Sequence, residues 1–219
     1  MITAKQSQNG IKNQGKGVKP LGHTLLPFFI VLKAIVLIVS LTTQLSAQTQ
    51  LVKGTLYSET VEIAGRTLTL VGAGLRERWW FDIYTMGAYV ESHTCNPQIL
   101  ISVDEVKLLR IDLLRDVEAK SMARALEDAF EKNLPTEGRS SVRVQINKAL
   151  SYFKKDLKKG DSMELTYVPS VGTAIIQNSE QQGMTIPGKG FADVLWSSYF
   201  SSSTCCSGLK KRILAQCSQ

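Results

Sequence analysis

The sequence has few of the residues on which most catalytic and metal sites depend. Its 219 residues include only two histidines and four cysteines, and no two cysteines have Cys-x-x-Cys spacing. Structural zinc sites need closely spaced Cys or His ligands, and most hydrolase triads need a histidine as the base. No Gly-x-Ser-x-Gly motif is present to form a nucleophile elbow. We therefore expect no metal site, no cofactor and no hydrolase triad.

Internal repeats and paired carboxylates are also missing. Without a repeat period the chain is not a solenoid, and 43% apolar with 21% charged residues excludes wholesale disorder. No two acidic residues lie together in an apolar setting, so glycosidase chemistry has no support. The length suits one globular domain, or two small ones.

Acidic residues are absent from the first 47 residues, which differ from the rest of the chain. Four lysines precede a mostly apolar run, Leu25–Leu41, and Leu45-Ser46-Ala47 follows it. A basic n-region, an apolar h-region and small residues at the cleavage site predict a signal peptide over residues 1–47. The alternative is an uncleaved anchor, which needs about 20 continuous apolar residues, whereas Lys33 divides this run. We expect an exported, periplasmic protein whose domain covers residues 48–219.

The net charge of +7 invites a nucleic-acid hypothesis, but its location argues against one. The first 47 residues hold five lysines, and residues 48–219 carry 21 basic and 19 acidic side chains, a net charge of +2. Nucleic-acid binding also favours aromatic residues interleaved with basic ones, a pattern the chain lacks. Four lysines between Lys154 and Lys159 are expected to lie solvated at a helix end. We expect no nucleic-acid partner, and membrane contact only through the signal segment.

All four cysteines lie after the predicted signal segment, so export would permit disulfides. They are Cys95, Cys205, Cys206 and Cys217. A bond between the vicinal Cys205 and Cys206 is disfavoured because its eight-membered ring strains the peptide between them. One of this pair could instead join Cys217 and fasten the C-terminal helix, while the other reaches Cys95. The sequence leaves the pairing open.

The first half of the domain has the period-two pattern of strands. Residues 51–60 are expected as a polar, extended lead-in. Val61–Leu75 predicts two short strands joined at Ala64-Gly65-Arg66, and Gly72-Ala73-Gly74 is expected to interrupt the chain before a long strand over residues 78–91. The pattern places Trp79, Phe81, Ile83 and Tyr89 on one face of that strand, and Trp80, Tyr84, Met86 and Val90 on the other.

The second half mixes helices and strands. Asn96-Pro97 opens a short helix, a strand covers residues 106–114, and Asp116 is expected to cap a helix ending near Asn133. A helix from Ser140 or Ser141 to Gly160, strands within 161–186, and helices over 191–200 and 209–216 follow. Segregated strands and helices predict an α+β fold, with a mainly antiparallel sheet and helices on one face.

The segment Gly72-Ala73-Gly74-Leu75-Arg76 is the first candidate for chemistry. A dinucleotide fingerprint would need a third glycine three residues later and a following helix. Position 77 is glutamate and a strand is expected next, so nucleotide binding is excluded. Arg76 is either a solvated residue at a strand end or an anion anchor that reaches into a cleft.

A family resemblance is carried by this segment and by others in the same order. The matching pieces are Val61–Arg76, Phe81–Glu91, Lys159-Gly160-Asp161, Gly172-Thr173, Gly190-Phe191-Ala192 and Leu209-Lys210-Lys211. Together they resemble the chalcone isomerase-like family over about residues 54–215, in a bacterial, exported, non-plant form. The resemblance implies an open-faced β-sandwich, with a curved antiparallel sheet, a layer of helices on one side and a ligand cleft between them.

The resemblance also implies site residues. Plant enzymes of this family cyclise a chalcone with an Arg, a strand Thr, a helix Tyr and Asn, and a late Thr or Ser. In this sequence these positions fall at Arg76, at Tyr84, at Lys120 and Glu127, and at Ser198. Only the arginine stands within its motif, and neither the helix Tyr nor the helix Asn is matched, although placed donors are what stabilises an enolate.

The family also includes fatty-acid-binding members, so the resemblance implies a non-catalytic protein that binds a small amphipathic or carboxylate ligand, such as a fatty acid. Arg76 would pair with the carboxylate, the Tyr84 hydroxyl would assist, and Trp79 and Trp80 would line an apolar pocket. The alternatives are an isomerase or intramolecular lyase acting on an unknown substrate, and an interaction protein whose cleft is filled by its own side chains.

Overall fold

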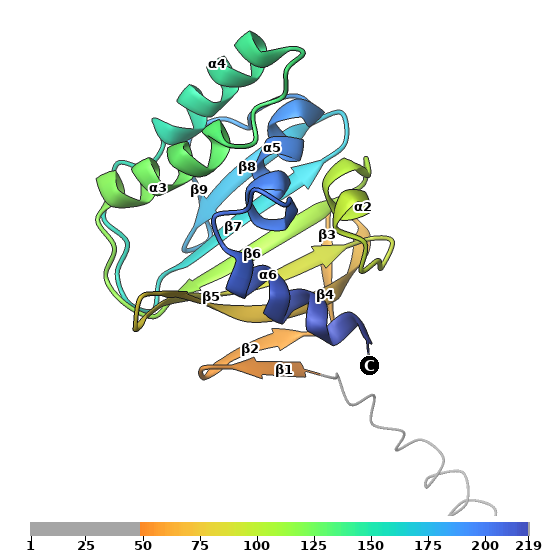
Figure 1. Cartoon of the computed structure of the whole chain (residues 1–219), viewed down its shortest axis with the longest axis vertical. Coiled ribbons are helices and arrows are strands. Elements are labelled where there is room, and N and C mark those ends of the chain that lie inside the picture. Colours follow the sequence, from red (N-terminus) through yellow and green to blue (C-terminus); the bar gives the residue numbers. More distant parts are fainter. Residues whose placement is uncertain (1–48, 219) are drawn as a thin grey trace, which may run out of the picture. The chain divides into compact units, whose positions relative to one another are not determined.

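A seven-stranded antiparallel sheet forms the centre of the protein (Figure 1). The computed structural model describes residues 49–218, and the predicted signal segment lies outside them. The strands pair in the order β3-β4-β5-β6-β7-β8-β9, which is also their order along the chain. Their bounds are β3 Thr60–Ile63, β4 Arg66–Arg78, β5 Phe81–Val90, β6 Lys107–Leu113, β7 Ser162–Val168, β8 Gly172–Gln177 and β9 Glu180–Gln181.

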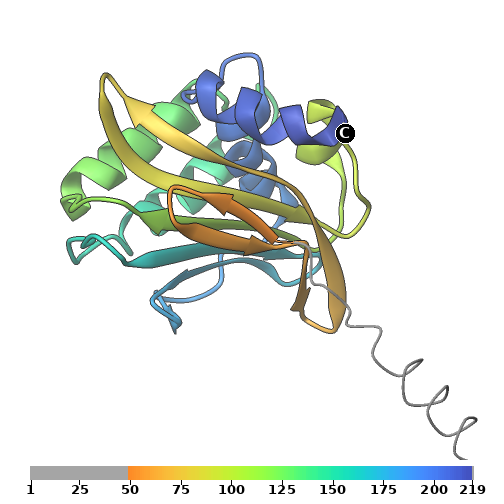
Figure 2. The ribbon, with the colours of Figure 1, turned by 90° about the horizontal axis from the view of Figure 1, so that it is seen from below.

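The helices cover one face of this sheet (Figures 1 and 2). They are α2 Pro97–Ser102, α3 Ala119–Glu131, α4 Arg139–Leu150, α5 Lys189–Phe200 and α6 Ser207–Leu214, and a 3-10 turn at Ala215–Ser218 follows. The predicted α+β architecture, a curved antiparallel sheet with helices on one side, is confirmed. Among the described residues no helix is both long and apolar enough to cross a bilayer.

The main core lies between the sheet and the helices. Alternate residues of β5, among them Met86 and Val90, pack there with the fully buried Trp196 of α5. Tyr89 belongs to a second core on the opposite face, as its period-two position predicts. Ile83 packs against the main core instead of joining Tyr89, because β5 is irregular where it meets β4 at Arg76–Glu77.

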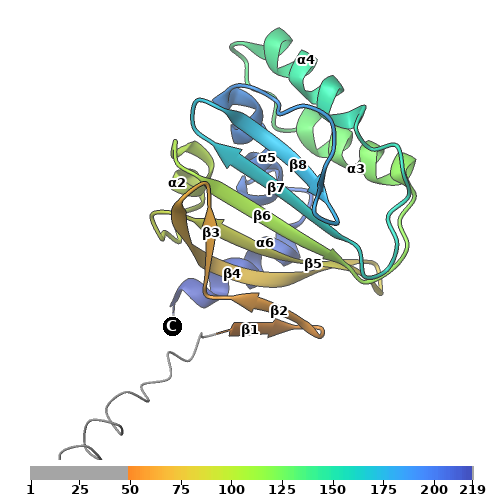
Figure 3. The same cartoon turned by 180° about the vertical axis from the view of Figure 1, so that it is seen from behind.

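A hairpin of β1 Thr49–Val52 and β2 Thr55–Ser58 covers the second core. Figure 3 shows it below the sheet, seen with the helices behind. The buried Tyr57 hydroxyl hydrogen-bonds to the Thr85 hydroxyl (2.8 Å) and the Asp112 carboxylate (2.9 Å). The segment expected as an extended lead-in is therefore extended, but it folds back on itself.

Strand β4 continues through the glycines that were expected to interrupt it. The predicted turn before it is confirmed, with positive φ at Ala64 and Gly65. A Cβ on Gly72 would lie 2.2 Å from the Ile213 carbonyl oxygen, and one on Gly74 would lie 2.9 Å from Arg212 Cβ. The glycines let α6 approach the strand closely, so they serve packing and do not end the strand.

The helix boundaries differ from the expected ones. Asp116 does not cap α3, because its carboxylate accepts the Lys159 backbone N–H (2.9 Å). The first N–H of α3, at Ala119, donates to Asp156, 37 residues away in sequence. Helix α4 has Gly138 at its N-cap and not Ser140 or Ser141.

Helix α4 also ends ten residues earlier than expected, at Leu150 instead of Gly160. The chain then continues through a turn and irregular structure, and Leu157 forms a β-bridge with Val117. The lysines from Lys154 to Lys159 therefore lie on a loop and not at a helix terminus. The short helix α2 is as predicted, since the Asn96 side chain accepts the Gln98 N–H at 2.9 Å and Pro97 follows the cap.

Trp79 and Trp80 occupy the turn between β4 and β5. The sequence pattern placed them inside a strand on opposite faces, but the paired strands end at Arg78 and resume at Phe81. Both indole side chains are 79% exposed. The pattern predicted a continuous strand because aromatic residues favour strands. The turn was missed because two-residue hairpin turns usually contain Gly, Asn or Asp.

Candidate functional site

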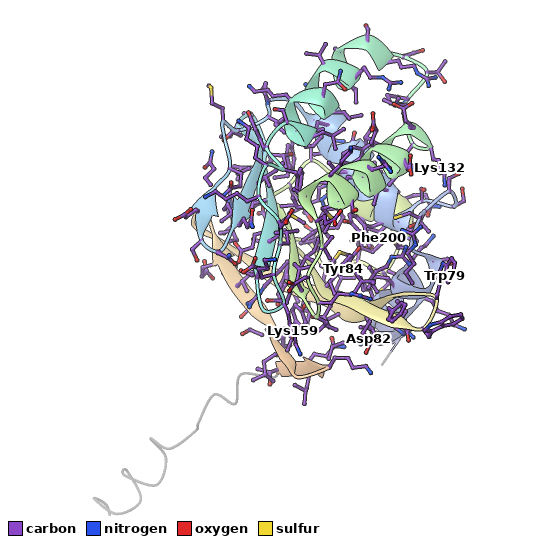
Figure 4. The ribbon with its side chains drawn as sticks, turned by 90° about the vertical axis from the view of Figure 1, so that its left-hand side faces the viewer. Trp79, Asp82, Tyr84, Lys132, Lys159 and Phe200 are labelled. Atoms are coloured by element: carbon purple, nitrogen blue, oxygen red, sulfur yellow. The ribbon has the colours of Figure 1, made fainter. Side chains whose placement is uncertain are left out.

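A pocket of about 430 Å³ lies between the sheet and helices α3 and α5. Figure 4 labels Tyr84 of its wall, with Trp79 at the periphery of the same view. The ends of β4 and β5, the chain before α3, and the connection after α5 complete the wall. The lining residues are Arg76, Arg78, Ile83, Tyr84, Arg115, Asp116, Val117, Glu118, Ser121, Met122, Ala125, Leu126, Ala129, Ser198, Tyr199, Cys205 and Cys206.

Arg76 and Tyr84 are directly opposite each other on paired strands. The half-buried Arg76 guanidinium donates to the Glu77 carbonyl oxygen at 2.7 Å, and it makes no ion pair with a carboxylate among residues 49–218. Burial raises the pKa of the Tyr84 phenol well above its usual value, an effect that the charge of Arg76 partly opposes. The phenol therefore stays protonated at neutral pH beside an unpaired cation.

Helix α5 contributes Ser198 and Tyr199. The buried Ser198 hydroxyl donates to the Val194 carbonyl oxygen at 2.9 Å, so its proton is used within its own helix. Burial also raises the pKa of Tyr199, against the effects of the Tyr84 hydroxyl and the Arg76 charge. The pocket thus holds two protonated phenols that can donate hydrogen bonds.

Two free cysteines complete this side of the pocket. Cys205 is exposed and Cys206 is buried, whereas Cys95 is disulfide-bonded. The bridges expected from the vicinal pair to Cys217 and Cys95 are therefore wrong, because the connection between α5 and α6 places both thiols on the pocket wall. A hydrogen bond from Cys206 and the charge of Arg76 lower the pKa of Cys205 to about 7, although partial burial opposes them. The same hydrogen bond, together with burial, raises the pKa of Cys206.

Helix α3 presents mainly apolar residues to the pocket. Met122 and Leu126 are buried there, and Ser121 supplies a hydroxyl. Lys120 and Glu127 lie on the same helix but are exposed and do not line the pocket. The structure therefore brings together Arg76, Tyr84 and Ser198 of the expected positions, and leaves these two outside.

The two tryptophans expected to line the pocket do not do so. Trp79 borders only a separate, shallower hollow, and Trp80 lines neither the hollow nor the pocket. Sequence reasoning missed Tyr199, Arg115 and the thiol pair as pocket residues. The adjacent Ser198 was a usable signal for Tyr199, but nothing in the local sequence marks Arg115. Among residues 49–218 no group of three or more His, Cys, Asp and Glu residues is arranged to hold a metal ion.

A family model described as chalcone isomerase-like matches residues 49–215. The chain belongs to the chalcone isomerase-like family. This match includes every residue that lines the pocket, so the pocket is part of the family domain. A comparison with curated protein sequences finds no match.

The fold is also similar to that of a solved structure. The crystal structure of the Arabidopsis thaliana fatty-acid binding protein AtFAP1 matches with a TM-score of 0.63 and 14% sequence identity. The match covers 78% of this chain and 97% of that one. At this identity the likeness establishes the shared fold, a curved antiparallel sheet layered with helices.

Proposed function

We propose that this protein binds a small amphipathic carboxylate, such as a fatty acid, in the pocket between β4, β5 and α3 without transforming it. The observation that carries the proposal is Arg76, a half-buried guanidinium on the pocket wall without a carboxylate partner among the described residues. A desolvated arginine favours a bidentate carboxylate ligand. The structurally similar AtFAP1 is a fatty-acid binding protein, which supports the same ligand class.

The distribution of polarity in the pocket supports an amphipathic ligand. Arg76 and the Tyr84 hydroxyl offer donors to a headgroup, while Met122, Leu126 and Ala129 form an apolar wall for a hydrocarbon chain. The volume of about 430 Å³ lies within the range of roughly 300–1,000 Å³ typical of small-molecule pockets. Such a site holds the headgroup by charge and the chain by burial.

We further propose that the protein is an exported, bacterial member of the family. The support is the lysine-rich lead and apolar run of residues 1–47, which has the order of a signal peptide. In a Gram-negative host this places the protein in the periplasm. Fractionation of cells that express the full chain tests this, together with N-terminal sequencing. A mature protein beginning near residue 48 is expected, and a cytoplasmic, uncleaved chain would contradict export.

The binding proposal is tested with a matched pair of ligands and a matched pair of variants. Dodecanoic acid and dodecanol share a chain, but only the acid offers a carboxylate to Arg76. We expect Arg76→Gln to weaken binding of the acid about 10- to 100-fold, since hydrogen bonds to charged groups contribute about 1.5–3 kcal/mol. Dodecanol binding should change little, and isothermal titration calorimetry measures both.

Arg124→Gln is the control variant, because Arg124 is an exposed residue of α3 outside the pocket. It should leave both affinities unchanged. Equal acid binding by the parent and by Arg76→Gln would remove the anion-anchor role. An absence of binding by either ligand, with no ligand detected by native mass spectrometry, would favour an interaction protein.

An isomerase is the second candidate, favoured by one specific observation. Tyr84 and Tyr199 are protonated phenols near Arg76 in the pocket, and donors placed at an oxygen that gains charge stabilise an enolate. Chalcone turnover followed by absorbance tests this role. A rate above buffer that falls in Tyr84→Phe would support catalysis, and a rate equal to buffer would exclude it for chalcones.

A further inference from the structure

The turn between β4 and β5 carries an exposed aromatic cluster. Trp79 and Trp80 are each 79% exposed and Phe81 is 50% exposed. The two indoles contact each other edge to face, with their ring centroids 5.9 Å apart. Figure 4 shows Trp79 at the outer end of the hairpin. We call Trp79, Trp80 and Phe81 the aromatic tip. Exposed aromatic clusters of this kind mark sites that contact another apolar surface.

The backbone of the aromatic tip does not favour the residues that occupy it. Trp79 has a φ of +62°, a left-handed conformation in which a bulky residue is a genuine outlier. Gly or Asn would form this turn without that strain. A tryptophan at this position therefore points to a role for its side chain outside the fold.

The charges around the aromatic tip are predominantly positive. The nearby carboxylates of Glu77 and Asp82 already form ion pairs, with Arg212 and with Lys53 respectively. Arg78 and Arg115 make no ion pair within residues 49–218, and the Arg115 guanidinium lies 4.6 Å from the Phe81 ring centroid. Aromatic residues and unpaired arginines thus occupy the same surface.

The aromatic tip lies beside the opening of the ligand pocket. A shallow hollow of about 290 Å³ is lined by Arg78, Trp79, Phe81, Ile83 and Arg115. Three of these residues, Arg78, Ile83 and Arg115, also line the main pocket. Whatever contacts the aromatic tip therefore also lies next to residues of the pocket wall.

We propose that the aromatic tip docks the protein onto a lipid bilayer with anionic headgroups, so that the pocket opens toward the lipid. Tryptophan favours the boundary between headgroups and acyl chains, where its ring is buried and its N–H stays hydrated. Arginines near an anionic surface are attracted to its headgroups. Docking requires no ligand in the pocket, so it can be tested apart from the proposed function.

The charge at this site favours a lipid surface over a second copy of the chain. Two aromatic tips packed against each other would bring Arg78 and Arg115 of both copies together, and like charges in a desolvated contact repel. An anionic headgroup layer supplies the opposite charge across the whole contact. One lipid surface then both buries the aromatic rings and pairs the arginines with anionic headgroups.

Tryptophan fluorescence of the full chain gives a local measurement of docking. The protein has three tryptophans, and the third, Trp196, is fully buried. Vesicles of phosphatidylglycerol and phosphatidylcholine with brominated acyl chains quench indoles that enter the bilayer. We expect quenching and a blue shift with these vesicles, a smaller effect with phosphatidylcholine alone, and a weaker effect at high salt. Quenching reports on the tip itself, whatever other segments touch the lipid.

The variant Trp79→Asn/Trp80→Ser removes the aromatic anchors and suits the turn, so it should fold. Because it lacks the two rings that would enter the bilayer, its partition into vesicles should be at least about tenfold weaker, since burying a large apolar side chain contributes about 1.5–3 kcal/mol. Since Trp196 is its only indole, vesicle sedimentation of the variant accompanies the fluorescence. Arg78→Gln should lower partition about fivefold to anionic vesicles only. Met184→Ser is the control, because Met184 is a 73% exposed side chain away from the tip.

Two results would overturn the proposal. One is that anionic and zwitterionic vesicles quench the parent protein equally, and no more than they quench the double variant, in which Trp196 is the only tryptophan. The other is a dimer in solution that Trp79→Asn/Trp80→Ser dissociates, which would assign the tip to a second copy of the chain. Failure of docking with intact dodecanoic acid binding would leave the proposed function standing, and the converse result would remove only that function.

Discussion

At the scale of single residues, Trp79 combines an unfavourable backbone with an exposed side chain. Its φ of +62° differs from that of Trp80, which is not positive, while both residues share the same edge-to-face contact. Trp79→Asn and Trp80→Ser each break that contact, but only the first relieves the turn. We expect the free energy of unfolding of Trp79→Asn to be about 1 kcal/mol larger than that of Trp80→Ser, so that Trp79→Asn is the more stable variant. Urea unfolding measures both, and equal stabilities would show that the turn is not strained.

Cys205 is a residue whose reactivity follows from its neighbours. A hydrogen bond from Cys206 and the charge of Arg76 lower its pKa from 9.0 to about 7, so the thiolate is abundant at neutral pH, whereas the pKa of Cys206 is raised. Iodoacetamide should alkylate Cys205 far faster than Cys206 in the reduced protein, with a rate midpoint near the lowered pKa. Mass spectrometry of the peptides measures both rates.

The same experiment separates the effect of Arg76 on Cys205 from that of distant charges. Arg76→Gln should move the midpoint to higher pH, since it removes a charge that stabilises the thiolate. Arg124→Gln should not move it. Saturating dodecanoic acid should slow alkylation if the ligand occupies the pocket. Equal rates for the two cysteines would contradict the assignment.

At the scale of elements, the contact between β4 and α6 depends on glycine. A Cβ on Gly72 would lie 2.2 Å from the Ile213 carbonyl oxygen, a backbone atom of α6 that cannot move alone, while a Cβ on Gly208 would meet nothing within 4 Å. Gly72→Ala should lower the free energy of unfolding by about 2–3 kcal/mol. Gly208→Ala, in the first turn of α6, should leave it unchanged or raise it by less than about 1 kcal/mol. Thermal unfolding compares them, and a neutral Gly72→Ala would mean that α6 shifts freely.

The elements also show how far sequence patterns reach. Strands with alternating residues, such as Thr67–Leu70 in β4, and the cap at Asn96 were predictable because their signals lie within a few residues. The start of α3 was not, because its first N–H is satisfied by Asp156 from a distant loop. The end of α4 was missed for the same reason, since the bridge between Val117 and Leu157 ends the helical pattern early.

At the scale of the whole molecule, a buried lysine links stability to pH. The Lys107 ammonium donates to the Leu100 and Ile101 carbonyl oxygens (3.2 and 3.0 Å) at the end of α2, and it lies 4.9 Å from the Trp196 ring centroid of α5. Burial lowers its pKa from 10.5 to about 8, although Asp193 opposes the shift. Between these two values the unfolded chain binds a proton that the native protein releases. The free energy of unfolding therefore rises with pH in this window.

We expect the parent protein to gain about 1–2 kcal/mol relative to Lys107→Met between about pH 8 and pH 9.5. The comparison with the variant cancels other titrating groups, and guanidinium unfolding at each pH measures it. Lys107→Met also leaves two α2 carbonyl groups without their donor, so its absolute stability should be lower at every pH. Parallel pH profiles for the two proteins would contradict the shifted pKa.

The whole fold was more predictable than the site. The order of strands and helices, together with the segment around Gly72 and Arg76, was enough to predict the architecture and the family resemblance. Arg76 and Tyr84 were expected at one site from the family resemblance, and the structure places them opposite each other on paired strands. The position of Cys205 in the pocket was not predictable, because it depends on how the connection between α5 and α6 crosses the end of the sheet. Such long-range placement leaves no local pattern in the sequence.

The order of the main sheet has a consequence for how the chain assembles. Each of its strands pairs with the strand next along the chain, and these pairings join neighbouring parts of the sequence, the longest of them crossing α3 and α4 between β6 and β7. Helix α6 is different, because Arg212 donates to the Leu75 carbonyl oxygen across 137 residues. During folding the helix-facing side of β4 stays bare until α6 docks on it. A chain that stops before Ser207 would keep every strand of the sheet and expose an apolar face, which is a substrate for chaperones and proteases.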